Sequence, residues 1–361
     1  MTKNIGIQKL RACAVMMVFI FHCYSRWAPP ENGENLYLWN TNKIVSFISS
    51  FGYLGVHLFF MISGFVIHMT LTRKSNISQF YFARIRRIYP ASIICVSLIF
   101  LIKKISGTNF QLNRPIDLIP SLLLISPEFI KVTLGIDTRW ITGVLWSLFV
   151  EIQFYALVGV IFYKIRKYKF EQKLFILSII STFFKVGYVL TSISVFKYID
   201  ELFPLINYIW YFTAGVLFYD IYVKDSRSNY SAKVKIFFTL LYLLATIQLH
   251  DFATIKSIAN CAIILVYFLV FGYISKNRHG NQKRVTIFSK IGDLSFEIYL
   301  IHESFCMIVF SLIHQKEGNT ILMASPILFL VLIIFLSKKL QIFTDFVTSY
   351  SLNKFLRPKL T

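Results

Sequence analysis

The chain has 361 residues, of which 56% are hydrophobic and only 15% charged, and its formal net charge is +21. Soluble domains carry roughly 25% charged residues, so this composition excludes an ordinary soluble globular protein. Apolar runs close to the ~20 residues that cross a bilayer recur along the chain. Because these runs are continuous, whereas barrel strands alternate, they also exclude a transmembrane β-barrel.

These runs predict an all-α integral membrane protein with about ten transmembrane helices, in one transmembrane domain over residues 1–361. The alternation of basic loops predicts the orientation. If alternate loops are assigned to one side, starting from the N-terminus, that side holds most of the 38 lysines and arginines. This positive-inside bias places both termini in the cytoplasm and accounts for the net charge without a nucleic-acid partner. The predicted spans are 10–27, 46–69, 86–102, 142–163, 174–194, 204–222, 235–250, 257–274, 287–312 and 321–337.

The first predicted span carries Arg11 and His22 in "KLRACAVMMVFIFHC". Eleven residues at 100° each bring both side chains onto one helix face, about 16 Å apart along the axis. This spacing puts Arg11 at the cytoplasmic interface and His22 near the bilayer midplane. Histidine is the side chain best suited to exchange a proton near neutral pH. The alternative is a structural histidine, hydrogen-bonded to a neighbouring helix.

The second and third spans add small and basic residues. Ser63 precedes a glycine in "MISGFVIH", where small residues allow close helix packing or contact with a ligand. Arg84 and Arg87 in "FARIRRIYPA" are three residues apart and share a helix face at the cytoplasmic mouth. An arginine pair suits phosphate oxygens, although positive anchors for lipid head groups have the same composition.

Two later spans carry the remaining buried polar residues. Glu151 in "LWSLFVEIQFYAL" lies near mid-membrane, where a carboxylate needs a partner. Tyr299 and His302 in "IGDLSFEIYLIHESF" lie on one helical stripe, and Glu303 lies closer to the outer surface. His22, Glu151 and His302 thus come to similar depth from three spans. Ionisable residues within a membrane mark a pathway or a site, so these spans predict proton chemistry at mid-depth beside a cytoplasmic anion site.

The five cysteines all fall in predicted spans, and no pair has the spacing of a zinc site. We therefore expect no bound metal and no disulfide framework.

Five segments resemble the acyltransferase-3 family of membrane acyltransferases, in the same order along residues 5–305. The segments are "KLRACAVMMVFIFHCY", "GVHLFFMISGFVI", "FARIRRIYPA", "LWSLFVEIQFYAL" and "IGDLSFEIYLIH". The resemblance implies transfer of an acyl group, most often acetyl, from cytoplasmic acyl-CoA to a hydroxyl of a cell-surface or secreted glycan, such as O-antigen, capsule or exopolysaccharide. It implies a multi-pass protein of the bacterial inner membrane, with acetyl-CoA as co-substrate, no tightly bound cofactor, and a glycan or lipid-linked glycan as acceptor.

The resemblance also implies which residues of this chain match the family's motif positions. The family's basic residue and histidine of the first span match Arg11 and His22, and its arginine pair matches Arg84 and Arg87. Its WSL…E segment matches Glu151, but relatives often have two consecutive acidic residues where this chain has Glu151 and then Ile152. The late tyrosine–histidine segment matches Tyr299 and His302. We also expect the stand-alone form of the family, without a C-terminal hydrolase-like domain.

These matches define a mechanistic hypothesis. We expect His22 to act as general base or transient acyl carrier, with Glu151 orienting its ring. We expect Arg11, Arg84 and Arg87 to bind the phosphates of acyl-CoA, and Ser63, Tyr299 and His302 are candidates for acceptor or oxyanion contacts. A proton-coupled transporter or flippase of a glycan precursor is the competing class, since it would need the same intramembrane ionisable residues. Against it, the sequence shows no internal repeat.

Overall fold

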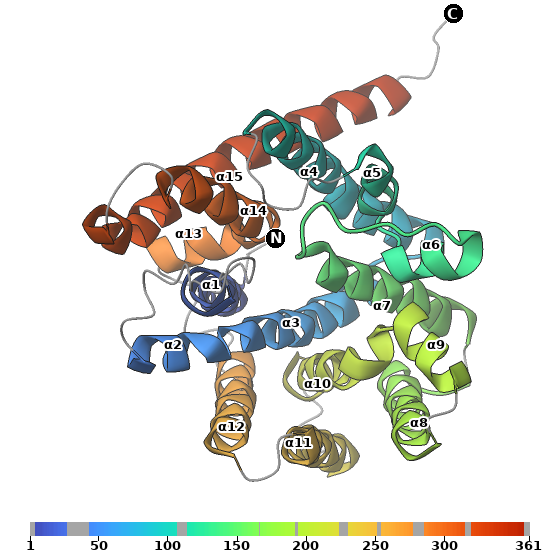
Figure 1. Ribbon diagram of the computed structural model, residues 1–361. Coiled ribbons are helices and arrows are strands. Elements are labelled where there is room, and N and C mark those ends of the chain that lie inside the picture. The colour runs from blue at the N-terminus through green and yellow to red at the C-terminus, as the bar shows by residue number, and fades with distance from the viewer. Residues whose placement is uncertain are drawn as a thin grey trace, which may run out of the picture. The chain divides into compact units, whose positions relative to one another are not determined.

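A computed structural model describes residues 4–26, 43–106, 114–165, 167–191, 194–223, 230–250, 254–276, 285–314 and 319–356 (Figure 1). Every regular element in these ranges is helical. The long helices are α1 (Ile5–Phe21), α3 (Leu54–Leu71), α4 (Ile77–Ser106), α7 (Leu145–Lys164), α8 (Phe170–Thr191), α10 (Leu205–Val223), α11 (Tyr230–His250), α12 (Ile255–Lys276), α14 (Ser295–His314) and α15 (Asn319–Leu356). The short ones are α2 (Lys43–Ser49), α5 (Leu118–Leu123), α6 (Pro127–Leu134), α9 (Ser194–Leu202) and α13 (Ile287–Asp293).

The structure confirms the all-helical prediction, and each of the ten predicted spans falls largely on a helix. Six helical segments among the described residues are long and apolar enough to cross a membrane: Ile5–Ser25, Phe47–Leu71, Ile77–Ile105, Leu145–Lys164, Ser231–Gln248 and Ile255–Ile274. We therefore conclude that the chain is a multi-pass helical membrane protein. The total of about ten spans remains a prediction, and so does the cytoplasmic location of both termini.

Contacts divide the chain into two compact units, each built from separate stretches of sequence. The first unit comprises Met1–Ala14, Tyr53–Tyr81 and Val150–Gly292, and the second comprises Val15–Gly52, Phe82–Phe149 and Asp293–Thr361. The prediction of one transmembrane domain is not tested by this division. The candidate site residues fall in both units, and each unit is described separately below.

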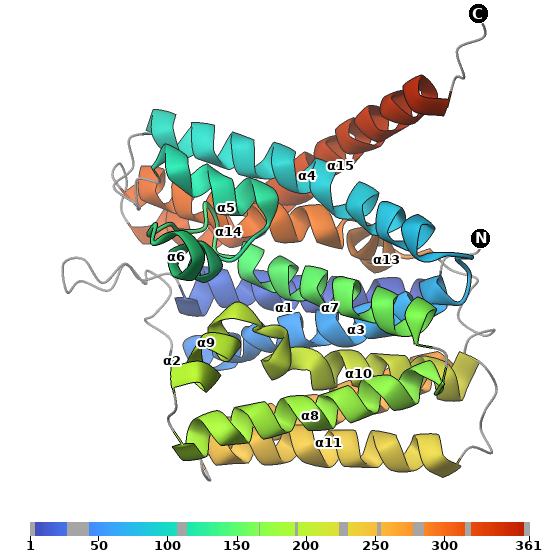
Figure 2. The same cartoon turned by 90° about the vertical axis from the view of Figure 1, so that its right-hand side faces the viewer.

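Glycines allow close helix packing in the first unit. The most extensive helix–helix contact of the first unit joins α3 and α10. Helix α10 also packs against α8 and α11, as Figure 2 shows. A Cβ atom at Gly64 would collide with the backbone carbonyl of Phe212, and one at Gly215 would lie 2.8 Å from the backbone nitrogen of Phe65. The absence of side chains at these two positions lets the helix backbones approach each other closely.

Side-chain hydrogen bonds fix the course of the segment before α7 in the second unit. The Asp117 carboxylate accepts from the backbone nitrogens of Arg114 at 2.8 Å and Arg139 at 3.0 Å. The Ser121 hydroxyl accepts from the backbone nitrogen of Ile141 at 2.9 Å. Because Asp117 and Ser121 are buried, these bonds are shielded from water and hold residues 139–141 beside the short helix α5.

Replacing Gly64 with alanine should destabilise the first unit by about 1–3 kcal/mol, the usual cost of overpacking a well-packed interior. Thermal unfolding of the detergent-purified protein measures the effect as a lower Tm. Gly187→Ala is the matched control, because a Cβ atom there would meet only the side chain of Phe196, at 3.2 Å or more. Equal Tm values for the two variants would contradict this account of the α3–α10 contact.

Candidate active site

His22 is held in a defined tautomer where α1 passes into a π-helical turn, His22–Arg26. The side chain is buried, with 8% of its surface exposed. Its Nδ1 lies 2.9 Å from the carbonyl oxygen of Val18 and 3.1 Å from Nε2 of His302. Since a carbonyl can only accept, the partners assign a proton to Nδ1. In the neutral ring, Nε2 therefore carries the lone pair.

His302 on α14 is completely buried and complements this assignment. Its Nδ1 lies 2.8 Å from the carbonyl oxygen of Tyr299 and 3.2 Å from that of Ile298. Both carbonyls require a proton on Nδ1, which leaves Nε2 of His302 to accept from His22. The two rings meet edge to face, with centroids 4.9 Å apart. His302 thus fixes the orientation of the His22 ring.

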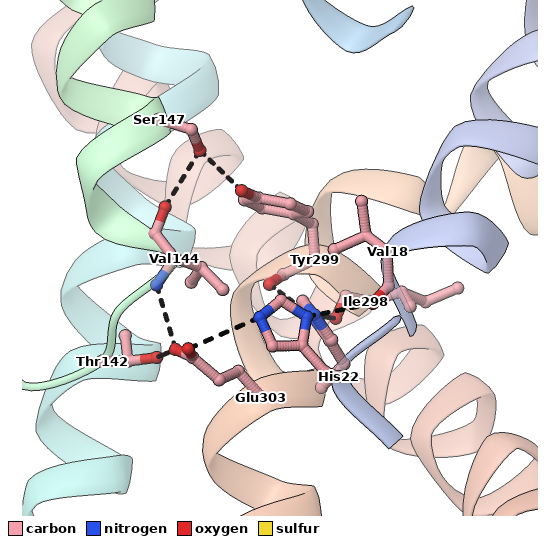
Figure 3. Close-up of polar contacts among 9 residues, drawn as sticks. Val18, His22, Thr142, Val144, Ser147, Ile298, Tyr299 and Glu303 are labelled. Atoms are coloured by element: carbon pink, nitrogen blue, oxygen red, sulfur yellow. Dashed lines mark hydrogen bonds and ion pairs between the residues drawn. The ribbon is translucent and has the colours of Figure 1, made fainter. Parts of the chain in front are cut away.

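Glu303 presents its carboxylate to the remaining nitrogen of His22, as Figure 3 shows. Its Oε1 lies 3.6 Å from Nε2 of His22. Its Oε2 accepts from the Thr142 hydroxyl at 2.7 Å and from the backbone nitrogen of Val144 at 3.0 Å. Because the Val144 N–H can only donate, Oε2 is an acceptor, and any proton shared with His22 lies on the Oε1 side.

The turn that holds Glu303 places a glycine against the carboxylate and is joined to α14 a second time. A Cβ atom at Gly143 would come within 2.6 Å of Oε1 of Glu303, so a side chain there would displace the carboxylate. At the start of α7, the Ser147 hydroxyl donates to the Val144 carbonyl at 3.0 Å and lies 2.6 Å from the Tyr299 hydroxyl. Since the Ser147 proton is used in this way, Tyr299 donates to Ser147.

Glu151 belongs to a separate polar cluster in the first unit. The Ser63 hydroxyl on α3 donates to Oε1 of Glu151 at 2.6 Å, and the Tyr155 hydroxyl, one helical turn along α7, donates to the same oxygen. The Ser63 and Tyr155 hydroxyls are 3.2 Å apart. The structure therefore brings together Ser63 and Glu151, which the sequence analysis had not paired.

The three candidate arginines differ in exposure. Arg11 on α1 is half-buried, and so is Arg84 on α4, whose Nε and one terminal guanidinium nitrogen are shielded from solvent. Arg87 lies one helical turn after Arg84 and is exposed. Arg84 and Arg87 both lie within the continuous helix α4, three residues apart.

In the second unit, the structure brings together three residues that the sequence singled out: His22, Tyr299 and His302. Sequence reasoning missed the roles of Glu303 and Thr142. Glu303 was placed nearer the surface, although its position directly after His302 in an apolar helix was a usable signal. Nothing in the sequence indicated that Thr142 and Val144 would act as hydrogen-bond donors, because they precede α7 and follow no helical period.

The geometry of the second unit suits proton transfer. An imidazole with one nitrogen fixed as donor and the other as acceptor can act as a general base, and the carboxylate 3.6 Å from the accepting nitrogen stabilises the ring once it is protonated. The same ring nitrogen can also act as a nucleophile. The ring of His302 borders this base, whereas the hydroxyl of Tyr299 is bonded to Ser147.

Comparisons with known proteins agree with this chemistry. A family model described as "Acyltransferase domain" matches residues 4–337. The chain is 30% identical over 193 residues to the "O-acetyltransferase OatA" of Staphylococcus aureus, a match that covers 49% of this chain and 28% of the relative. It is 28% identical over 165 residues to the "O-acetyl transferase" of Shigella phage Sf6, covering 44% of this chain and 46% of the relative.

These matches thus span less than half the length of each of the two relatives. No solved structure matches the chain. The family model, by contrast, covers nearly all of the chain, from the first helix into α15. By this match, the chain belongs to the acyltransferase family.

Proposed function

We propose that this chain transfers an acetyl group from acetyl-CoA to a hydroxyl of a bacterial surface or secreted glycan, within the plasma membrane. The observation that carries the proposal is the pairing of His22 Nε2 with the Glu303 carboxylate in a chain of an acyltransferase family. The names of the two relatives specify O-acetyl transfer. The acceptor is a glycan or a lipid-linked glycan, and the donor is a co-substrate that leaves as free CoA.

In the proposed reaction, His22 acts as the general base. Its Nε2 takes the proton of the acceptor hydroxyl while that oxygen attacks the thioester carbonyl. The C–S bond then breaks, and the CoA thiolate recovers the proton from the imidazolium. Glu303 stabilises the imidazolium, while the Val18 carbonyl and His302 hold the ring. A route in which Nε2 first carries the acetyl group uses the same geometry and remains the alternative.

The other candidate residues serve binding and orientation in this proposal. Arg84 and Arg87 bind the phosphates of CoA, because guanidinium groups match phosphate oxygens and stay charged. Arg11 contributes to the same donor affinity. Tyr299 and His302 stay candidates for acceptor or oxyanion contacts, and Ser63 is proposed for an acceptor contact in its own unit. The orientation of His22 by Glu151 stays a prediction.

Replacing His22 with glutamine should lower acetyl transfer by about 10²-fold or more, since general-base catalysis contributes roughly 10²–10⁴-fold. The measurement is incorporation of labelled acetyl from acetyl-CoA into glycan by the membrane-inserted protein. His57→Gln is the matched control, because His57 is a half-buried histidine on α3 in the first unit. Wild-type activity in the His22 variant would sink the assignment. Accumulation of a glycan precursor in vesicles without acyl-CoA would indicate a transporter instead.

Replacing Arg84 and Arg87 together with alanine should raise the KM for acetyl-CoA by about tenfold or more and leave kcat nearly unchanged. Hydrogen bonds to charged groups contribute roughly 1.5–3 kcal/mol, and loss of uniform binding appears in KM alone. Arg73→Ala, at an exposed arginine just after α3, is the control. A fall in kcat with unchanged donor affinity would contradict the phosphate role.

The contributions of the Glu303 and Glu151 carboxylates to kcat are distinguished by replacing each residue with its amide. Glu303→Gln should lower kcat, because the imidazolium loses its counter-charge, and should leave donor affinity unchanged. The parallel Glu151→Gln variant tests the predicted orientation of His22: if Glu151 orients the ring, both variants lower kcat to a similar degree. Full activity of Glu303→Gln in the acetyl-incorporation assay would remove Glu303 from the mechanism.

A further inference from the structure

The two oxygens of the Glu151 carboxylate differ in their hydrogen bonds. Oε1 accepts from the Ser63 hydroxyl at 2.6 Å and also from the Tyr155 hydroxyl. Ser63 and Tyr155 are buried, whereas Glu151 is half-buried. A hydroxyl has a single proton to donate, and both of these protons are directed at Oε1. One oxygen of the carboxylate therefore takes both hydroxyl donors of the cluster.

The second oxygen of Glu151, Oε2, is accessible. Within the described part of the chain it accepts no hydrogen bond, and it is not among the side-chain atoms that packing shields from solvent. Glu151 nevertheless belongs to a helical segment that is apolar enough to cross a membrane, Leu145–Lys164. A charged oxygen in such a segment is costly without a donor, and ionisable residues there face an interior pathway or site. Oε2 is therefore placed to accept hydrogen bonds from a bound molecule.

Two helices hold this carboxylate in a fixed position. Ser63 precedes Gly64 on α3, and the close approach of Gly64 to the Phe212 backbone fixes α3 against α10. Tyr155 lies one helical turn after Glu151 on α7. A binding group on helices, with its orientation fixed by hydrogen bonds, is more precise than one on a loop. The cluster thus presents a preorganised hydrogen-bond acceptor.

The charge of Glu151 distinguishes between the two substrates of the proposed reaction. An ionised carboxylate only accepts hydrogen bonds, and like charges placed against each other are costly. The phosphates of acetyl-CoA are therefore unsuited to this position, whereas a neutral glycan offers many hydroxyl donors. The lone pairs of Oε2 can accept from one hydroxyl or from two neighbouring ones. Of the two substrates, the glycan matches the chemistry of this oxygen.

We propose that Oε2 of Glu151 binds a hydroxyl of the acceptor glycan, while Ser63 and Tyr155 position the carboxylate through Oε1. The identity of the ligand rests on the proposed function, but its binding is measurable without any reaction. The acceptor contact proposed for Ser63 is then made through Glu151, because the Ser63 proton is already donated to the carboxylate. Glu151 contributes to acceptor affinity, and the base chemistry belongs to the second unit.

The kinetic test measures the KM for the glycan separately from the KM for acetyl-CoA. The probe is cell-envelope glycan from a strain of the producing bacterium that lacks this gene. Glu151→Gln should raise the KM for this glycan by about tenfold, because a hydrogen bond to a charged group becomes a neutral one. The kcat and the KM for acetyl-CoA should stay nearly unchanged. Glu201→Gln, at a half-buried glutamate on α9 of the same unit, is the matched control.

The two hydroxyls give a graded comparison. Ser63→Ala and Tyr155→Phe each remove one donor to Oε1 but keep the charge of Glu151, so each should raise the glycan KM less than Glu151→Gln does. A larger effect of Ser63→Ala would show that the Ser63 hydroxyl itself meets the glycan, and it would overturn the inference. A lower kcat with unchanged glycan KM in Glu151→Gln would also overturn it and would fit orientation of the His22 ring instead.

A binding measurement on the wild-type protein depends neither on catalysis nor on the folding of a variant. Dicyclohexylcarbodiimide, an apolar reagent that modifies accessible carboxyls within membranes, is added to the protein in lipid nanodiscs, and mass spectrometry locates the adduct. We expect an adduct on Glu151 that the same glycan reduces several-fold and that acetyl-CoA leaves unchanged.

Three results of this measurement would contradict the inference: no adduct on Glu151, no protection by the glycan, or protection by acetyl-CoA instead. Failure of the proposed function is seen separately, as a wild-type protein that transfers no acetyl group to the glycan. If the glycan still protects Glu151 in that case, the binding site stands and the assigned reaction falls.

Discussion

A buried carboxylate is the constraint on which the second unit depends. Glu303 lies within an apolar helix with 5% of its surface exposed, and an ionised carboxylate without partners there would cost several kcal/mol. The Thr142 hydroxyl and the Val144 backbone nitrogen donate to this carboxylate, and His22 adds a counter-charge when its ring is protonated. To supply two of these partners, the chain before α7 forms a turn with glycine at its centre. The hydrogen bonds of Asp117 and Ser121 hold the segment that leads into this turn.

The two polar clusters differ in chemical character although each contains one glutamate. In the first unit, two hydroxyls donate to one oxygen of Glu151. Hydroxyl donors stabilise an ionised carboxylate but do not exchange protons readily, because Ser and Tyr hydroxyls ionise far above neutral pH. In the second unit, the carboxylate faces an imidazole, which exchanges protons near neutrality. This difference is the physical reason for assigning the base chemistry to the second unit.

The helices and the two histidines could be predicted from the sequence, whereas the partners of Glu303 could not. The physical reasons for the success and for the failure differ. Long apolar runs and isolated ionisable residues follow directly from the cost of placing polar groups in lipid. His22 and His302 were placed at similar depth by counting residues along straight helices, and their rings meet at a nitrogen–nitrogen distance of 3.1 Å. Thr142 and Val144 reach the site through a turn, whose direction follows no helical period.

The hydrogen bonds of Asp117 have an evolutionary consequence. Segments outside membrane spans usually diverge quickly among relatives, because they tolerate substitution and insertion. Here the segment from Arg114 to Ile141 is joined through Thr142 to the carboxylate beside His22. Substitutions in the exposed helix α6 are therefore tolerated more readily than changes to the path of the chain through Arg139 and Ile141. Adjoining stretches of the same loop are then expected to diverge at different rates.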